Sequence, residues 1–203
     1  MITRFILSSE NKYQPSCPRN YSICLCVIVF FALSIKELAP TSFAETHSQR
    51  VLLQVPLIKQ PYMQCLNACV SMVLKYWGLE ISVDFIEKHV PVYKDGTTGK
   101  DLALFVEEAG FHGFLIQPPF EDLIQHVNKE RPVIVTLPVK GRLRHALVLV
   151  GFDLTSNIVW LNDPATGKCA AQSLNSFRKQ WESGKRWAFL IVPKQTSAPP
   201  SRE

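Results

Sequence analysis

Two cysteines in the segment "KQPYMQCLNACVSMVLKYWG", residues 59–78, have the spacing and the surroundings to be considered as nucleophiles. Cys65 directly follows a turn-like stretch, and Cys69 comes one helical turn later. Apolar residues recur after Cys65 at the spacing of an α-helix, up to Trp77 and the helix-ending Gly78. The pattern therefore predicts that Cys65 opens a helix and that Cys69 lies inside it.

The position at the start of the helix favours Cys65 over Cys69 as the nucleophile. A helix N-terminus carries unpaired N–H groups and partial positive charge, which stabilise a thiolate and lower the pKa of the thiol. Cys69 lies on nearly the same face but farther from the helix end, where a thiol is most often a small core residue. A capping or buried role is the alternative for Cys65, and partner residues decide against it.

A cysteine nucleophile needs a base within hydrogen-bond reach and a third group that orients the base. Among the five histidines, His145 heads "HALVLVGF", the most apolar strand of the mature chain, where an imidazole would be held rigidly. His112 opens another predicted strand and stays open as a second candidate. The remaining histidines lie near the N-terminus or on amphipathic helices, where solvated side chains are expected: His47, His89 and His126.

The orienting group follows from strand arithmetic. The turn at 153–157 joins strands 145–152 and 157–162 as a hairpin, and facing residues of an antiparallel pair have a constant index sum. If His145 and Asp163 faced each other, the centre of the hairpin turn would lie midway between them in the chain, within the predicted turn "DLTSN". The two residues are therefore expected to be close, within a residue or two of register. Asp163 also suits a turn role in "NDPATG", and both roles can hold together.

Gln60 completes the predicted site, because acyl transfer needs hydrogen-bond donors aimed at the developing oxyanion. Its amide, a few residues before the nucleophile, would form that site with the N–H of Cys65. In chain order, Gln60, Cys65, His145 and Asp163 make one constellation. A zinc site built from Cys65, Cys69 and His145 is a weaker alternative, because a single Cys-x3-Cys pair is a poor zinc pattern. We therefore expect neither a metal nor a cofactor.

The predicted elements place helices first and strands later. Periodicity and turn signals predict helices at 65–77, 82–90, 100–110, 120–130 and 173–183. They predict strands at 112–117, 132–138, 145–152, 157–162 and 186–193, with a short strand within 47–58. This order predicts an α+β fold with N-terminal helices packed on a mostly antiparallel sheet.

The first 44 residues have the pattern of a signal peptide. The apolar run at 23–35 is shorter than the roughly 20 residues of a membrane span, and basic residues precede it. Ser42 and Ala44 place small residues at the two positions that a signal peptidase reads. Cleavage after Ala44 would release a periplasmic or secreted protein with no stable membrane insertion; an uncleaved N-terminal anchor is the alternative. The expected organisation is a signal peptide at 1–44, one domain at 45–193 and a disordered tail at 194–203.

Cleavage would leave three cysteines, an odd number in an oxidising compartment. At least one thiol must then stay free, and pairing of Cys69 with Cys169 would leave Cys65 alone.

Hydrophobic residues make up 47% of the chain, enough for a sizeable core, and the net charge is only +5. No long basic run interleaved with aromatic residues is present, so a nucleic-acid partner is not indicated.

The order and spacing of these residues resemble the papain-like clan, and most closely the bacteriocin-processing double-glycine cysteine peptidases. The resemblance runs from about Val55 to Pro193 and includes Gln60 before a cysteine, the helix ending in "KYWG", "HALVLVGFD" and "IVWLNDPATGK". It implies a papain-like fold and a polypeptide substrate. It also implies Cys65 as nucleophile, His145 as general base, Asp163 as its orienter and Gln60 as oxyanion donor.

The sequence departs from that family in three respects. Leu66 follows the cysteine where the family usually has Gly, and this side chain could narrow the cleft or alter the oxyanion loop. The export domain and ATPase usually fused to the peptidase are absent from these 203 residues, and the chain is expected to be exported. We therefore expect a stand-alone exported cysteine peptidase with no identified export-system partner. A related acyl transferase or amidase, or a non-catalytic peptide-binding module, is the alternative.

Overall fold

The computed structural model describes residues 50–94, 96–139 and 143–194. The predicted signal peptide, His47 and residues 195–203 lie outside these ranges. Within them the helices are α2 Cys65–Tyr76, α3 Val83–His89, α4 Gly99–Glu108, α5 Phe120–Asn128 and α6 Leu174–Ser183. The strands are β1 Arg50–Leu52, β2 Phe111–Ile116, β3 Val133–Pro138, β4 Arg144–Asp153, β5 Ile158–Asp163, β6 Lys168–Ser173 and β7 Ala188–Pro193. None of the helices in the described ranges is long and apolar enough to cross a membrane.

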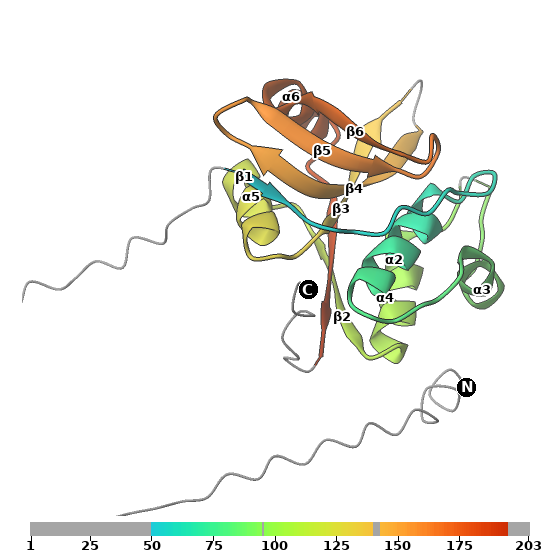
Figure 1. The fold of residues 1–203 in the computed structure, drawn as a ribbon. Coiled ribbons are helices and arrows are strands. Elements are labelled where there is room, and N and C mark those ends of the chain that lie inside the picture. Colours follow the sequence, from blue (N-terminus) through green and yellow to red (C-terminus); the bar gives the residue numbers. More distant parts are fainter. Residues whose placement is uncertain (1–49, 95, 140–142, 195–203) are drawn as a thin grey trace, which may run out of the picture. The chain divides into compact units, whose positions relative to one another are not determined.

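The strands form one antiparallel sheet in the order β2-β7-β3-β4-β5-β6, and β1 pairs with the far end of β4 (Figure 1). β4 is the longest strand, with neighbouring strands along both edges, and nearly all of it is buried because α2 and α5 also pack against it. The apolar run that begins at His145 thus occupies the centre of the sheet. This architecture confirms the predicted α+β fold with helices on an antiparallel sheet.

The helices begin close to where the sequence predicts. The hydroxyl of Ser82 accepts a hydrogen bond from the N–H of Phe85 at 3.1 Å and caps α3. Thr98 caps α4 in the same way, accepting from the N–H of Asp101 at 3.2 Å. These caps satisfy N–H groups that a helix start otherwise leaves unpaired. By contrast, Gln64 precedes α2 without any side-chain cap.

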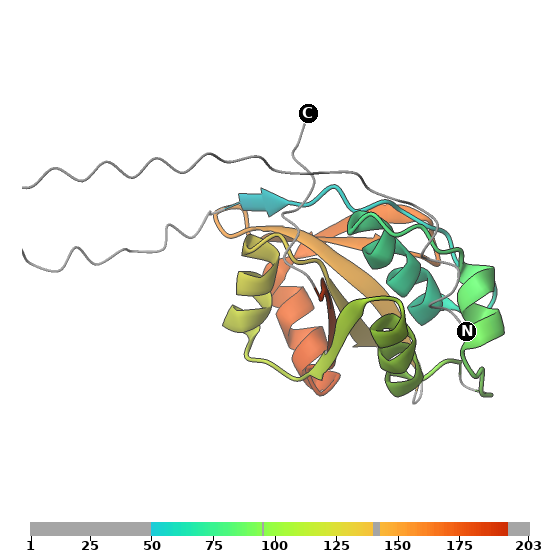
Figure 2. The ribbon, with the colours of Figure 1, turned by 90° about the horizontal axis from the view of Figure 1, so that it is seen from below.

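Two groups of helices flank the sheet. Helices α2, α3 and α4 lie beside one another, whereas α5 and α6 lie apart from them (Figures 1 and 2). α2 packs against β4, α4 against β2, and α6 mainly against β3. The packing of α2 on β4 is the contact that brings the start of the first helix to the start of the central strand.

Strand β6 is the one element of the described chain that the sequence analysis missed. Its sequence, "KCAAQS", lacks the β-branched and aromatic residues that indicate strands, and nearly all of its side chains are exposed. The segment is a strand because its backbone pairs with β5, with Cys169 opposite Asn162. Such pairing at a sheet edge leaves no hydrophobic pattern in the sequence.

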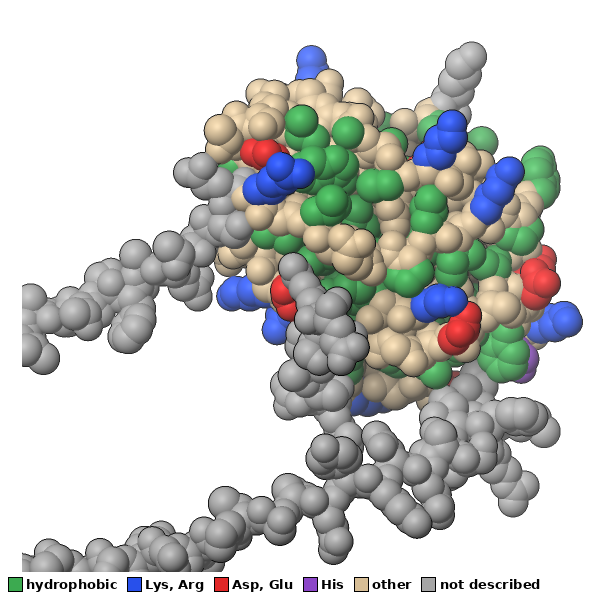
Figure 3. All heavy atoms as spheres, in the orientation of Figure 1, with side chains coloured by type: hydrophobic (Ala, Val, Ile, Leu, Met, Phe, Trp, Pro, Cys, Tyr) green, Lys and Arg blue, Asp and Glu red, His purple; other side chains and the backbone are tan. Residues whose placement is uncertain are grey.

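The surface carries its charges as single side chains. On the face seen in Figure 3, Lys and Arg side chains are scattered among apolar and neutral ones and form no continuous basic patch.

A buried amide attaches the segment before α2 to the sheet. Asn162, on β5, is only 3% exposed, and its Nδ2 donates to the backbone oxygen of Val55 at 3.0 Å. The segment from β1 to α2 has few regular backbone hydrogen bonds, so this contact fixes its path. Together with the hydrogen bond from the N–H of Gln60 to Pro164, it positions the segment that carries Gln60 into the site.

Replacement of Asn162 with Leu should lower the free energy of unfolding by about 1–3 kcal/mol, because the Val55 oxygen would stay buried without a donor. Chemical denaturation of the variant and the wild type measures this difference. Asn175→Ala, at an exposed position of α6, is the matched control and should stay within about 0.5 kcal/mol of wild type. An equal loss of unfolding free energy in both variants would contradict a stabilising role of the hydrogen bond from Asn162 to Val55.

Candidate active site

The thiol of Cys65 lies at the first residue of α2, as predicted. The preceding turn passes through Met63, whose φ of 59° is a left-handed conformation that turns the chain into the helix. No acidic residue occupies the first turn of α2, so no carboxylate competes for the positive end of the helix. Cys65 is half-buried and is packed against the core.

Opposing effects set the pKa of the Cys65 thiol. Burial alone would raise it, since a thiolate loses hydration. The hydrogen bond with His145, the backbone N–H groups of Ala146 and Leu66, and the charge of His145 outweigh burial, so the pKa is lowered. Cys65 is therefore an activated thiol. Cys69, one turn along, is fully buried without these partners, and burial raises the pKa of its thiol well above the ordinary value.

His145 stands between Cys65 and Asp163. Its Nε2 lies 2.7 Å from Oδ1 of Asp163, and the two side chains are 23% and 17% exposed. Although burial alone would raise the pKa of Asp163, the hydrogen bonds that it accepts lower that pKa, so it is an ionised acceptor and Nε2 carries the proton. Nδ1 is then left for Cys65. The hydrogen bond with Cys65 is the main cause that raises the pKa of His145.

The strand register differs by two residues from the predicted one. Val148 pairs with Asn162, and a bulge between Leu149 and Gly151 shifts the rest of the hairpin. His145 and Asp163 are therefore diagonal neighbours rather than directly opposite. Diagonal neighbours on one face are still within reach of long side chains, and the offset lies within the residue or two that the prediction allowed, so the predicted contact occurs.

The turn after Asp163 holds both the carboxylate and the Gln60 segment. Ala165 N donates to Oδ1 of Asp163 at 2.9 Å, and the Thr166 hydroxyl donates to Oδ2 at 3.1 Å. Pro164 accepts a hydrogen bond from the N–H of Gln60 at 2.9 Å. Asp163 thus has its predicted turn role and its contact with His145 together, and the same turn positions Gln60.

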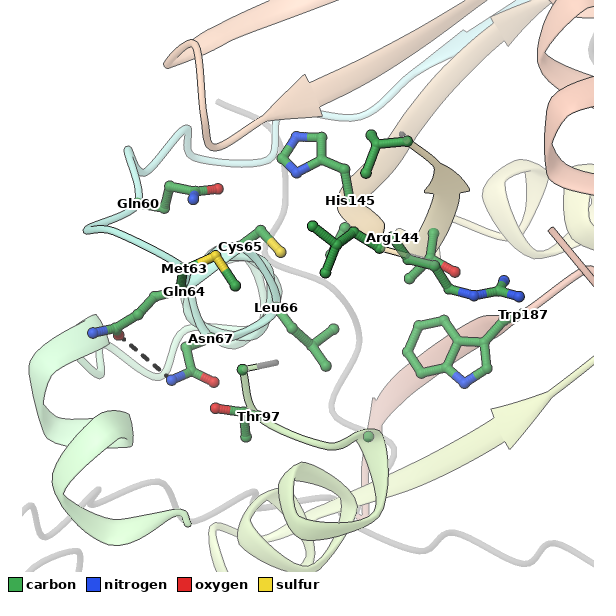
Figure 4. A pocket seen from close by; sticks show the side chains of 16 residues that line it. Gln60, Met63, Gln64, Cys65, Leu66, Asn67, Thr97, Arg144, His145 and Trp187 are labelled. Carbon is green, nitrogen blue, oxygen red and sulfur yellow. Dashed lines mark hydrogen bonds between the residues drawn. The ribbon is translucent and has the colours of Figure 1, made fainter. Parts of the chain in front are cut away.

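A cleft of about 700 Å³ opens between the helical part and the sheet, with Cys65 and His145 on its walls. Gln60 enters the same cleft beside Cys65 (Figure 4). The Oε1 atom of Gln60 is buried and has no hydrogen-bond partner among the described residues. The structure therefore brings all four predicted site residues to one place, although they come from four separate segments.

Leu66 contributes to the cleft directly after the nucleophile. Its side chain lines the cavity and packs against the core, where the related family usually has no side chain (Figure 4). The cleft nonetheless stays open between Leu66 and the opposite wall.

The sequence analysis did not identify the wall that faces Leu66. It is made by residues of β3, β4 and the loops beside them: Thr136, Val139, Leu143, Arg144, Ala146 and Trp187. Of these residues, only Arg144 could have been recognised from the sequence, because it is a charged residue directly before the candidate base His145. Trp187 joins the wall because β7 lies beside β3, which no local pattern indicates.

The other described cysteines and histidines are not part of the group formed by Cys65, His145 and Asp163. Cys65, Cys69 and Cys169 all hold free thiols, so the possible Cys69–Cys169 disulfide is absent from the structure. His89 contacts the Phe85 carbonyl on α3, and His112 contacts Glu107. Within the described ranges, no group of three His, Cys, Asp or Glu side chains is arranged to hold a metal.

The helices and the antiparallel sheet have the α+β fold of papain-like peptidases, as solved relatives show. The peptidase domain of Streptococcus ComA, a bifunctional ABC transporter of a quorum-sensing pathway, superposes with a TM-score of 0.59 at 24% identity and covers 68% of this chain and 98% of that domain. A putative C39-like peptidase from Bacillus anthracis superposes with a TM-score of 0.62 at 16% identity, covering 72% and 99%. A double-glycine-motif protease from an AMS/PCAT transporter, solved in complex with the leader peptide, superposes with a TM-score of 0.56 at 19% identity. The match covers 71% of this chain and 95% of that protease.

The sequence itself assigns the family. The model of the Peptidase_C39 like family matches residues 52–188, more than half of the chain, so the chain belongs to this family. It is also 25% identical over 141 residues to the lactococcin-G-processing and transport ATP-binding protein LagD of Lactococcus lactis subsp. lactis. The match covers 68% of this chain but only 18% of that protein.

The lowered pKa of Cys65 should be visible in its reactivity with iodoacetamide at pH 6, read by mass-resolved peptide mapping. Cys65 should react about tenfold or more faster than Cys169, whose partial burial raises its pKa although it is exposed. The rate should fall as pH drops through the lowered Cys65 pKa, since protonation removes the thiolate.

His145→Ala should slow the alkylation of Cys65 at pH 6 toward the rate for Cys169, because the variant loses the main interaction that lowers the pKa of the Cys65 thiol. His112→Ala is the matched control and should leave the rate unchanged. Equal rates for Cys65 and Cys169 in the wild type would contradict an activated thiol.

Proposed function

We propose that this chain is a cysteine peptidase domain in which Cys65, His145, Asp163 and Gln60 carry out peptide-bond cleavage. The observation that carries the proposal is that His145 lies 2.7 Å from the carboxylate of Asp163 and lines the same open cleft as Cys65, whose thiol pKa it lowers. Membership in the Peptidase_C39 like family supports the same class of reaction.

In the first half of the reaction, the Cys65 thiolate attacks the carbonyl carbon of the scissile bond. As the S–C bond forms, the carbonyl electrons move to oxygen, and the oxyanion is held by the Gln60 amide and the N–H of Cys65. The imidazolium of His145 then gives its Nδ1 proton to the leaving nitrogen. The C–N bond breaks and leaves a thioester on Cys65.

In the second half, water replaces the departed amine. His145, now neutral, takes a proton from this water as its oxygen attacks the thioester carbonyl. The C–S bond breaks, and Cys65 leaves as a thiolate beside the regenerated imidazolium. Asp163 keeps the ring in one tautomer and one orientation throughout, because its carboxylate accepts the proton of Nε2 and leaves Nδ1 toward Cys65.

The proposed substrate is a polypeptide, and peptides with a Gly-Gly sequence are the first to test. One solved relative is named a double-glycine-motif protease and was determined with a leader peptide. The N-terminal sequence supports export to the periplasm or beyond, with residues 1–44 removed. Leader removal inside the cell is therefore not the role that we propose.

Gln60 offers a test that separates oxyanion stabilisation from thiol activation. Gln60→Ala should lower kcat for fluorogenic Gly-Gly peptides by about 10²–10³-fold, as loss of one oxyanion donor does elsewhere. Alkylation of Cys65 by iodoacetamide forms no oxyanion, so its rate should stay near the wild-type value. Steady-state kinetics and alkylation rates on one preparation measure both.

Gln54→Ala, an exposed glutamine of the same segment, is the matched control and should keep wild-type kcat. Cys65→Ala should have no measurable turnover. Fast alkylation of Cys65 without hydrolysis of any peptide would instead favour acyl transfer to another acceptor, which added amine nucleophiles would reveal. Slow alkylation of Cys65 would favour a peptide-binding module.

A further inference from the structure

The cleft ends away from Gln60 in a wall that the proposed chemistry does not use. Arg144 and Trp187 lie at that end, on the opposite side of the pocket from Gln60 (Figure 4). Leu143 and Val139 line the same wall, and each is 48% exposed, which is high for an apolar side chain. An apolar wall left open to solvent is a surface that a ligand can cover.

Arg144 brings a permanent positive charge to the described part of this lining. Apart from His145, no other residue among the described lining residues is charged, and none of them is acidic. No carboxylate of the described chain forms an ion pair with Arg144. An Arg at a concave site without a carboxylate partner can bind one from a substrate.

The guanidinium is held in place by the backbone. Nη1 of Arg144 donates to the carbonyl oxygen of Gly184, just after α6. This contact uses one of five N–H donors and leaves the others available. A fixed guanidinium loses less conformational freedom on binding than a mobile one.

An unpaired hydroxyl lies in the same wall. Thr136 is 8% exposed, and its Oγ1 is buried without a hydrogen-bond partner in the part of the chain that the structure describes. It pairs across β3 and β4 with Ala146, the residue after His145. The Oγ1 atom itself has almost no exposed surface, so the surface of the wall is an apolar lining with one cation. This combination suits a side chain with an apolar stem and an anionic end.

We infer that Arg144 and its wall form a specificity subsite that selects a glutamate side chain close to the scissile bond of the substrate. The inference rests on the proposed function and names the peptide class that the site would take. In it, the methylenes of the glutamate pack on the apolar wall and the carboxylate pairs with Arg144. Arg144 is a specificity residue and takes no part in bond breaking.

The test is a charge swap. Fluorescence-quenched decapeptides centred on Gly-Gly would carry one Glu, Gln or Lys in turn at each of the four positions on either side. Wild type should prefer Glu to Gln about tenfold in kcat/KM at one position, a preference that weakens with added salt. Arg144→Gln should lose the preference, and Arg144→Glu should favour Lys at that same position. Lys179→Glu replaces an exposed residue of α6 and changes the net charge by the same amount as Arg144→Glu. It should keep the wild-type preference for Glu.

Binding separates this inference from the proposed function. The dissociation constants of the same peptides for Cys65→Ala require no turnover, so a Glu preference there supports the subsite even if no peptide is cleaved. If Arg144 only clamps Gly184, its variants would lower the melting temperature without changing which peptide is preferred. No difference between Glu and Gln peptides, in binding or in cleavage, would overturn the inference.

Discussion

The reactivity of this domain depends on one interaction, between the thiol of Cys65 and the imidazole of His145. Cys65 comes from the start of α2 and His145 from the start of β4, and the packing of α2 on β4 holds them together. Neither group is activated alone, because burial by itself would raise the thiol pKa and lower the imidazole pKa. Each partner reverses the effect of burial on the other, so the reactivity of the site depends on the packing of the helix against the sheet.

The two cysteines of α2 show how local this effect is. They are one helical turn apart and have the same chemistry, yet the pKa of Cys65 is lowered and that of Cys69 is raised. The difference arises from the helix end, the N–H groups of Leu66 and Ala146, and the imidazole, none of which reaches Cys69. One thiol becomes a candidate nucleophile, and the other packs in the core.

The turn after β5 links the rest of the site to this contact. Asp163 accepts from His145, and the adjacent Pro164 accepts from Gln60, so base and oxyanion donor are positioned by consecutive residues. Asn162, the residue before them, holds Val55 and thereby the segment that carries Gln60. Three consecutive residues therefore fix the geometry around a helix that they do not belong to, and the wall with Arg144 and Trp187 completes the cleft opposite.

The sequence by itself determined which residues could take part and which elements carry them. Helical spacing placed Cys65 at a helix start, turn signals bounded the strands, and hairpin arithmetic brought Asp163 close to His145, because these patterns depend on neighbours in the chain. Only the tertiary structure decided the exact register of the β4–β5 hairpin, including its irregularity between Leu149 and Gly151, and the edge strand β6, which has no hydrophobic pattern. It alone decided the pKa directions and the wall around Trp187, because burial and contacts between distant segments depend on how the sheet and helices pack rather than on local spacing.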